Sequence, residues 1–159
     1  MTYVGIDVSK ATFVVAYSSA KNSKTRTFKN TTKGVHEFIQ TLSVTEHHCV
    51  LEATGNYSAL LVYLLSEAGI TVSLENPLKI KNFARVMLSV TKTDEIDARL
   101  IVLYGERMQP SPYKLRSEPI LIIKQKRTVL RQLKKQLVAT RNLKGSIEVL
   151  PHVDPRCKK

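Results

Sequence analysis

The stretch Tyr3-Val4-Gly5-Ile6-Asp7-Val8 decides how the chain is interpreted. Its large apolar residues recur at every second position, which is the period of a β-strand with one buried face. Asp7 lies on the opposite face. Two more β-rich stretches, 12–17 and 25–30, follow after short polar links. The three stretches together predict an antiparallel meander.

The pattern changes to alternating helices and strands after residue 30. Apolar spacing predicts the segments in this order: a helix over 33–43, a strand over 47–52, a helix from the N-cap Asn56 to about residue 68 ending at Gly69, a strand over 70–74, a helix from Pro77 and a helix over 93–107. Strands that alternate with helices indicate parallel pairing, so the sequence predicts an α/β layered domain.

The segment Gln109-Pro110-Ser111-Pro112 interrupts this pattern and predicts a boundary between a domain over 1–110 and an extension over 111–159. Within the extension, residues 118–145 are expected to form one long helix. Four apolar residues fit a heptad seam: Ile123, Leu130, Leu133 and Leu137. Lys126 interrupts the seam. A coiled coil and packing back on the domain therefore both remain open.

Composition narrows the functional class of this 159-residue chain, which carries 25 Lys/Arg and 13 Asp/Glu for a net charge of +12. Residues 112–159 hold 13 of the basic and 3 of the acidic side chains, a net charge of +10. This concentration favours a polyanion, above all nucleic acid, over a generic solvated basic helix. The apolar content of 43% excludes wholesale disorder, and no apolar run is long enough for a membrane span. Cys49 and Cys157 lack metal-ligand spacing, so we expect a reducing cytoplasmic setting.

Four carboxylates stand where this element order could bring them together. Asp7 lies on the first strand, Glu52 ends the strand after the meander, and Asp94 and Asp97 share one helix face. Carboxylate oxygens suit Mg²⁺ or Mn²⁺, and two such ions can clamp a phosphodiester.

Each carboxylate also has an ordinary structural explanation. Asp7 could be an exposed strand residue, and Glu52 could cap or pair with the next helix. Thr91-Lys92-Thr93-Asp94 has the form of a capping box, and acidic residues such as Asp97 favour a helix start through the macrodipole. Spacing alone therefore leaves the metal site undecided.

Three motifs resemble one family. They are Tyr3-Val4-Gly5-Ile6-Asp7-Val8-Ser9-Lys10, Leu51-Glu52-Ala53-Thr54-Gly55-Asn56-Tyr57 and Lys92-Thr93-Asp94-Glu95-Ile96-Asp97-Ala98. In this order they resemble the N-terminal domain of the DEDD transposases of bacterial insertion sequences, a family that includes pilin-gene-inverting and bridge-RNA-guided recombinases. The resemblance covers residues 3–107 and, more loosely, the basic helix to residue 145.

The resemblance implies a RuvC-like, ribonuclease-H-like mixed sheet of order 3-2-1-4-5, with strand 2 antiparallel to the rest. It implies that Asp7, Glu52, Asp94 and Asp97 are both the catalytic residues and the ligands of two Mg²⁺ or Mn²⁺ ions. It further implies DNA as substrate, and it leaves a guide RNA open. The basic helix is expected to act as a coiled-coil linker that joins copies of the chain into a homo-oligomer.

Family members continue into a C-terminal domain with a nucleophilic serine, which this sequence does not show. The chain is accordingly interpreted as an excised domain or a truncated product, incomplete for recombination. Nine basic residues are the expected nucleic-acid contacts: Lys10, Lys124, Lys126, Arg127, Arg131, Lys134, Lys135, Arg141 and Lys144. The main alternative function is a non-enzymatic nucleic-acid-binding or dimer-assembly module. An actin-like phosphotransferase also shares the Gly-x-Asp strand, but it needs two such domains and a phosphate loop.

Overall fold

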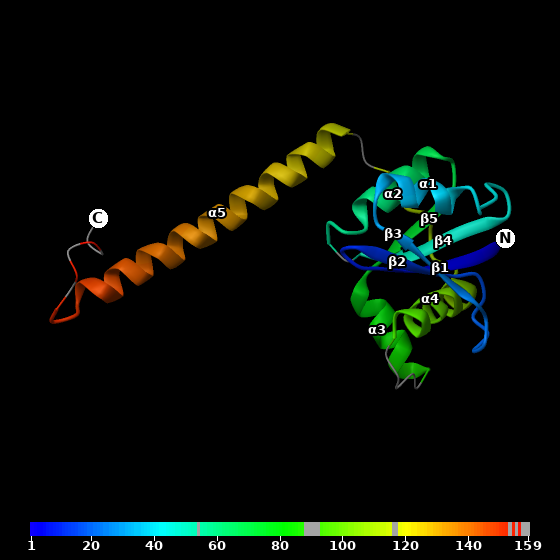
Figure 1. Ribbon diagram of the computed structural model, residues 1–159, viewed down its shortest axis with the longest axis horizontal. Coiled ribbons are helices and arrows are strands. Elements are labelled where there is room, and N and C mark those ends of the chain that lie inside the picture. The colour runs from blue at the N-terminus through cyan, green and yellow to red at the C-terminus, as the bar shows by residue number, and fades with distance from the viewer. Residues whose placement is uncertain (54, 88–92, 116–117, 153, 155, 157–159) are drawn as a thin grey trace. The chain divides into compact units, whose positions relative to one another are not determined.

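A computed structural model describes residues 1–53, 55–87, 93–115, 118–152, 154 and 156. The chain divides into two compact units, Met1–Leu115 and Arg116–Lys159, and each is described by itself. The first unit is a layered α/β domain, and the second contains one long helix (Figure 1).

A five-stranded mixed sheet forms the centre of the first unit. Its strands are β1 (Thr2–Val8), β2 (Thr12–Ala16), β3 (Thr25–Lys29), β4 (His47–Glu52) and β5 (Thr71–Glu75). Their spatial order is β3-β2-β1-β4-β5. β2 pairs antiparallel with β1 and β3, whereas β4 pairs parallel with β1 and β5. The predicted RuvC-like, ribonuclease-H-like topology is therefore confirmed, including the reversed second strand.

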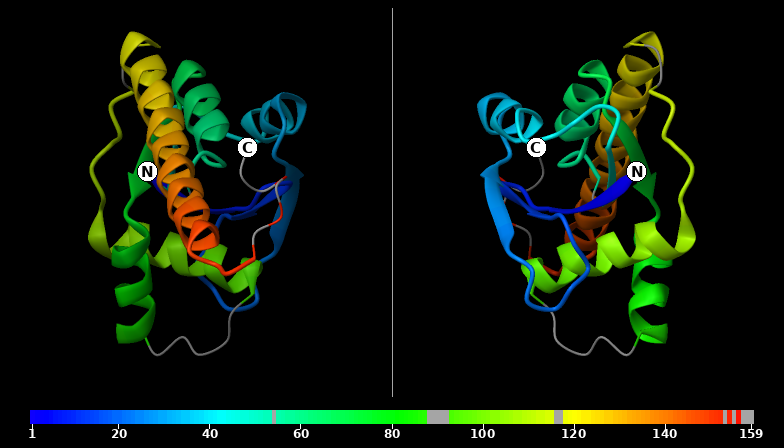
Figure 2. Two further views of the ribbon diagram at one scale, coloured as in Figure 1. Left: turned by 90° about the vertical axis from the view of Figure 1, so that its left-hand side faces the viewer. Right: turned by 90° about the vertical axis from the view of Figure 1, so that its right-hand side faces the viewer.

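Helices cover both faces of this sheet. They are α1 (Thr32–Ile39), α2 (Ala59–Glu67), α3 (Pro77–Val86) and α4 (Asp94–Met108). Figures 1 and 2 show α1 and α2 on one face and α3 and α4 on the other. The larger apolar core lies under α1 and α2, and a smaller one lies under α3 and α4. Asp7, Glu52 and other polar strand residues are consequently left on the α3/α4 side.

Three aromatic rings tie the meander to α1. Phe13 of β2, Phe28 of β3 and Phe38 of α1 are buried, and their ring centroids lie 5.3 to 5.5 Å apart. Each such ring contributes about 1.5–3 kcal/mol through burial. A Cβ at Gly34 would also clash with the Lys29 carbonyl oxygen, so α1 begins in close contact with the end of β3. The corner between β3 and α1 is thus a rigid part of the domain.

Several predicted helix ends differ from the structure. Asn56 is not the N-cap of α2, because the chain makes one more turn and the cap is Ser58. Helix α1 ends at Ile39 rather than residue 43. Gly69 follows the C-cap of α2 with a φ of +76°, as predicted. The N-cap of α4 is Thr93, so Asp94 is the first helical residue and not the third, as the expected capping box over 91–94 requires; residues 91–92 lie outside the described residues.

The segment after α4 packs against the edge strand β5. The Tyr113 amide donates to the Val72 carbonyl at 2.7 Å, and the Ser73 hydroxyl lies 3.0 and 2.9 Å from the Pro110 and Ser111 carbonyls. The first unit therefore extends to Leu115, whereas the sequence places the boundary after residue 110.

Helix α5 (Glu118–Glu148) is the body of the second unit. It is continuous over 31 residues, in agreement with the single long helix expected over 118–145. The three leucines of the predicted seam are 51 to 56% exposed: Leu130, Leu133 and Leu137. Among the described residues, no helix combines the length and the apolar character needed to cross a bilayer.

Candidate active site

Asp7 and Glu52 end neighbouring parallel strands. Ile6 of β1 pairs with Leu51 of β4, so Asp7 and Glu52 occupy the next position on each strand. Ile6 and Leu51 point into the core under α1 and α2, and side chains alternate along a strand. Asp7 and Glu52 consequently project from the opposite face, and both are half-buried.

Helix α4 crosses that face close to β1. A Cβ at Gly5 would lie 2.5 Å from the Val102 nitrogen, and a Cβ at Gly105 would lie 2.7 Å from the Tyr3 ring. The helix therefore approaches the strand without room for a side chain. Later helix residues meet earlier strand residues, so α4 runs antiparallel to β1. This direction places the first turn of α4 toward Asp7, which shares the face of Gly5.

That first turn carries the other two predicted ligands. Thr93 caps the helix by accepting a hydrogen bond from the Ile96 amide at 3.3 Å, and its carbonyl accepts the Asp97 amide at 2.8 Å. Asp94 is exposed and Asp97 is half-buried. Their spacing of three puts them on one face of the helix. The fold therefore directs the backbone positions of all four predicted ligands toward one end of the sheet.

Within the described part of the chain, no group of three or more His, Cys, Asp or Glu side chains has the arrangement of a metal site. The donor chemistry nevertheless suits a hard divalent cation, because all four predicted ligands are carboxylates.

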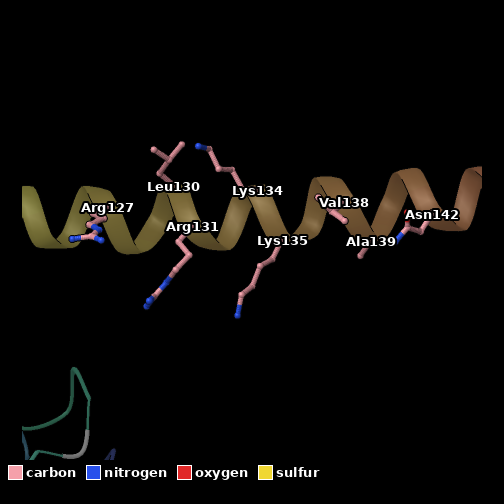
Figure 3. A pocket seen from close by; sticks show the side chains of 8 residues that line it. All are labelled: Arg127, Leu130, Arg131, Lys134, Lys135, Val138, Ala139 and Asn142. Carbon is pink, nitrogen blue, oxygen red and sulfur yellow. The ribbon is translucent and has the colours of Figure 1, made fainter.

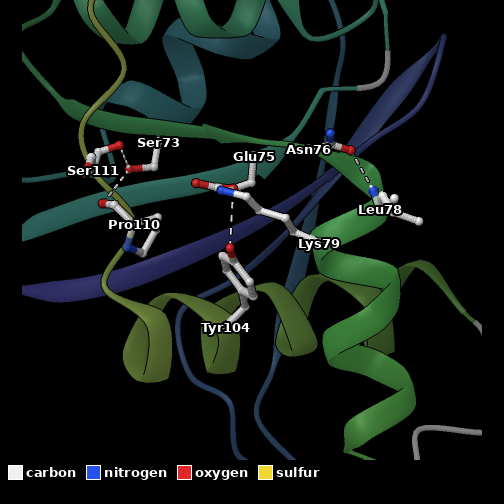
Figure 4. A network of polar contacts seen from close by, with 8 residues as sticks. All are labelled: Ser73, Glu75, Asn76, Leu78, Lys79, Tyr104, Pro110 and Ser111. Atoms are coloured by element: carbon white, nitrogen blue, oxygen red, sulfur yellow. Dashed lines mark hydrogen bonds and ion pairs between the residues drawn. The ribbon is translucent and has the colours of Figure 1, made fainter.

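A fifth carboxylate at this edge was missed by the sequence analysis. Glu75 ends β5 and pairs directly with Glu52 of β4. It is 91% buried, forms an ion pair with Lys79 at 2.9 Å and accepts a hydrogen bond from the Tyr104 hydroxyl at 3.3 Å (Figure 4). Its position at a strand end, like that of Glu52, was the signal that could have identified it.

The Glu75 carboxylate changes the titration of both partners. The pKa of Lys79 is raised, because its ammonium donates to Glu75 and is attracted by that charge. Burial raises the pKa of the Tyr104 hydroxyl, and the charge of Glu75 raises it further. The buried Glu75 carboxylate is thus paired with Lys79, which separates it in role from the more accessible Glu52.

A second polar network lies around Ser73 in the middle of β5 (Figure 4). His48 is 5% exposed, and its Nε2 lies 2.8 Å from the Ser73 hydroxyl. That hydroxyl has one proton, which it donates to the Pro110 or Ser111 carbonyl, so His48 Nε2 must be the donor to Ser73. Burial lowers the pKa of His48 and keeps its ring neutral. The network fastens the segment after α4 to the sheet.

The predicted nucleic-acid contacts lie in two places. Lys10 is exposed in the turn between β1 and β2, three residues after Asp7. The other eight are exposed on α5: Lys124, Lys126, Arg127, Arg131, Lys134, Lys135, Arg141 and Lys144. Of these, Lys144 also lies 3.9 Å from Glu148. A long, uninterrupted helix thus carries a high density of positive charge.

A shallow hollow on α5 combines four of these cations with apolar and small residues. It is lined by Arg127, Leu130, Arg131, Lys134, Lys135, Val138, Ala139 and Asn142. Figure 3 shows Leu130 and Lys134 leaving the helix on one side and Arg131 and Lys135 on the other. Since the lining comes from one helix, the hollow is an open surface rather than an enclosed cavity.

Comparison with known proteins identifies the family. The model of the IS110-type DEDD transposases, described as a transposase, matches residues 4–150. This chain belongs to the DEDD transposase family. Two relatives, the pilin gene-inverting proteins of Moraxella bovis and Moraxella lacunata, are each 32% identical over 164 aligned residues. The match covers 96% of this chain and 50% of each relative, so the chain spans about half the length of these curated transposase relatives.

Two solved structures also resemble the chain. One is the Thermus thermophilus RuvC structure, with 15% identity, a TM-score of 0.43 and coverage of 71% of this chain and 100% of RuvC. The other is T. thermophilus RuvC in complex with a Holliday junction substrate, with 16% identity, a TM-score of 0.45 and coverage of 71% and 99%.

Proposed function

We propose that residues 1–115 are the metal-dependent catalytic domain of a DNA-cleaving transposase or site-specific recombinase. Membership of the DEDD transposase family supports a role in DNA rearrangement. The observation that carries the proposal is the convergence of Asp7, Glu52 and the first turn of α4 on one end of the sheet.

In the proposed mechanism, the carboxylates bind the metal ions and a lysine binds the DNA. Asp7, Glu52, Asp94 and Asp97 would hold two Mg²⁺ or Mn²⁺ ions. When bound, these ions would supply Lewis-acid stabilisation of the attacking and leaving oxygens of a phosphodiester. Lys10 would bind a neighbouring phosphate. Because the chain spans about half of its relatives, complete strand transfer is assigned to a full-length protein, with this part contributing the carboxylates.

Helix α5 is the proposed nucleic-acid contact and the proposed contact between copies of the chain. Its eight exposed basic residues suit a phosphate backbone, and its exposed leucines suit a second copy of the helix. We propose duplex DNA as the ligand. Tighter binding of a structured RNA than of a DNA duplex of equal length at the same salt concentration would favour the guide-RNA alternative.

Calorimetric titration of the full chain with Mn²⁺ tests the metal site. Asp7→Asn and Asp97→Asn keep the shape of each side chain but remove a charged ligand, so each should weaken Mn²⁺ binding at least about tenfold. Glu95→Gln is the matched control. It removes one carboxylate from the same turn at a position that does not share the face of Asp94 and Asp97, so Mn²⁺ affinity should change less than about twofold.

A further variant, Asp94→Ala, separates the two candidate functions. In the catalytic proposal, Asp94→Ala abolishes Mn²⁺-dependent nicking of supercoiled DNA while DNA affinity through α5 remains. In a non-enzymatic binding module, Mn²⁺ produces no nicking in either protein. Equal Mn²⁺ affinity in the wild-type chain and Asp7→Asn would contradict the metal site directly.

A further inference from the structure

We propose that Asn30 is a positioning residue that holds two loops together at the end of the sheet that carries Asp7 and Glu52. This end is called the carboxylate edge below. The inference rests on the proposed function, because it concerns how that edge receives a DNA strand. The loops are the β1–β2 turn, Ser9–Ala11, and the turn over 55–58 before α2. The first begins two residues after Asp7, and the second begins three residues after Glu52.

Asn30 binds the first loop at two points. Its backbone amide donates to the Ala11 carbonyl at 2.8 Å, and its side-chain Nδ2 donates to the Ser9 carbonyl at 3.0 Å. Lys10 lies between these two carbonyls, so the peptide that carries it is gripped on both sides. The Ser9 hydroxyl and the Thr12 carbonyl close the same loop at 2.8 Å. The exposed ammonium of Lys10 therefore projects from a fixed base.

The same nitrogen also binds the second loop. Asn30 Nδ2 donates its other hydrogen to the Tyr57 carbonyl at 2.9 Å. Since the Ser9 and Tyr57 carbonyl oxygens lie 3.0 and 2.9 Å from one nitrogen, they are at most about 6 Å apart. Tyr57 itself is 48% exposed. One side-chain amide thus sets the distance between a loop that presents a cation and a loop that presents an aromatic ring.

The two carbonyls of Ser9 and Tyr57 require a side-chain amide whose nitrogen faces them. Asn30 Oδ1 is buried and has no hydrogen-bond partner among the described residues. Exchanging the nitrogen and oxygen would leave a buried donor unpaired and press an oxygen against two carbonyls. An aspartate at this position would place a charged oxygen, which has no hydrogen to donate, against the same two carbonyls. The unpaired acceptor is consistent with a residue retained for its two donors.

Asn30 also lies at the closely packed corner between β3 and α1. It lies between β3 and the N-cap of α1, Thr31, whose hydroxyl accepts the Gly34 amide at 3.3 Å. The packed rings of Phe13, Phe28 and Phe38 lie under this corner. A donor fixed in this way can restrain two loops that consist mostly of exposed residues.

Amide exchange measured by NMR on the full chain tests the clamp directly. Asn30→Asp and Asn30→Ala remove both side-chain donors, so exchange at Ser9 and Thr12 in one loop and at Ala59 after the other should accelerate together, about tenfold or more. Exchange in β4 should not change. Asn22→Asp, in an exposed turn at the opposite end of the sheet, adds the same charge as the control and should change neither loop.

A binding measurement tests the functional consequence. With Mn²⁺ present, Asn30→Asp should bind duplex DNA about tenfold more weakly, since displacement of a positioned group by about 1 Å has effects of this size or larger. Its Mn²⁺ affinity should stay within about twofold of the wild-type value. The Asn22→Asp variant should retain both affinities.

The inference is overturned if only one loop exchanges faster, if neither does, or if both loosen while DNA affinity is unchanged. It is also overturned if Asn30→Asp and Asn30→Ala both lose cooperative unfolding, since a loop clamp is not needed for the core. Failure of the proposed function would give a different experimental result from failure of this inference. In that case Asp7→Asn leaves Mn²⁺ binding unchanged, while the exchange data still decide whether Asn30 joins the loops.

Discussion

Replacing Gly5 by alanine should separate α4 from the sheet at the point that aligns the carboxylates. The added Cβ would lie 2.5 Å from the Val102 nitrogen and 2.9 Å from Val102 Cγ2, and it would also clash with the Ala98 carbonyl oxygen. Ordinary contact begins at 3.4 Å, so the helix must move by about 0.9 Å or more. Two of the three obstacles are backbone atoms, which cannot turn aside as a side chain can.

This displacement has two measurable consequences. Overpacking of this kind costs about 1–3 kcal/mol, and we expect the upper end, about 3 kcal/mol, in the free energy of unfolding. Metal ligands tolerate errors of about 0.2 Å, so a shift of the Asp97 turn by about 0.9 Å should also weaken Mn²⁺ binding at least about tenfold. All six tyrosines lie in the first unit, so tyrosine fluorescence during urea denaturation reports on that unit alone.

Gly105→Ala provides the matched control. It adds the same methyl group to the same helix–strand contact, but its obstacle is the Tyr3 side chain, which lies far from the carboxylate end. It should cost stability while Mn²⁺ affinity stays within about twofold. The reasoning is refuted if Gly5→Ala unfolds at the wild-type urea concentration, or if both variants affect Mn²⁺ binding equally.

Three further predictions follow from the helix cap, the buried histidine and α5. Thr93→Ala removes the N-cap of α4 and should lower the free energy of unfolding in urea by about 1 kcal/mol, whereas Thr93→Ser should retain most of it. Burial lowers the pKa of His48, so the unfolded chain binds the proton more readily than the folded chain. The contribution of His48 to the free energy of unfolding is therefore complete above pH 6.5. It falls as the pH drops below that value, by at most about 1.4 kcal/mol per pH unit. His48→Gln should remove this part of the slope, and an unchanged slope in urea titrations between pH 7 and 5 would contradict it. Lys134→Gln combined with Lys135→Gln should make the log–log salt dependence of duplex binding shallower by about 1.8, whereas the same change at Lys21 and Lys24 should not.

Local spacing was sufficient to predict most of the architecture. Alternation over residues 3–8 identified a strand with Asp7 on the outer face, and helical spacing identified the segments that became α1 to α5. These properties depend on residues a few positions apart, which is the range over which strand and helix periods act. Helix ends were less predictable, because Asn56 and Ser58 are both residue types that favour N-caps, and the turn over 55–58 delays the start of α2 to Ala59.

Contacts between residues distant in the chain were decided only by the tertiary structure. The order of the carboxylate motifs was visible in the sequence, but the approach of α4 to Gly5 was not, nor was the pairing of Glu75 with Glu52. Asn30 gave no signal, because the two carbonyls that its side chain binds lie 21 and 27 positions away. The periodicity of apolar residues determines which face of a strand or helix a side chain occupies. Only the packing of the whole chain determines which other residues contact that side chain.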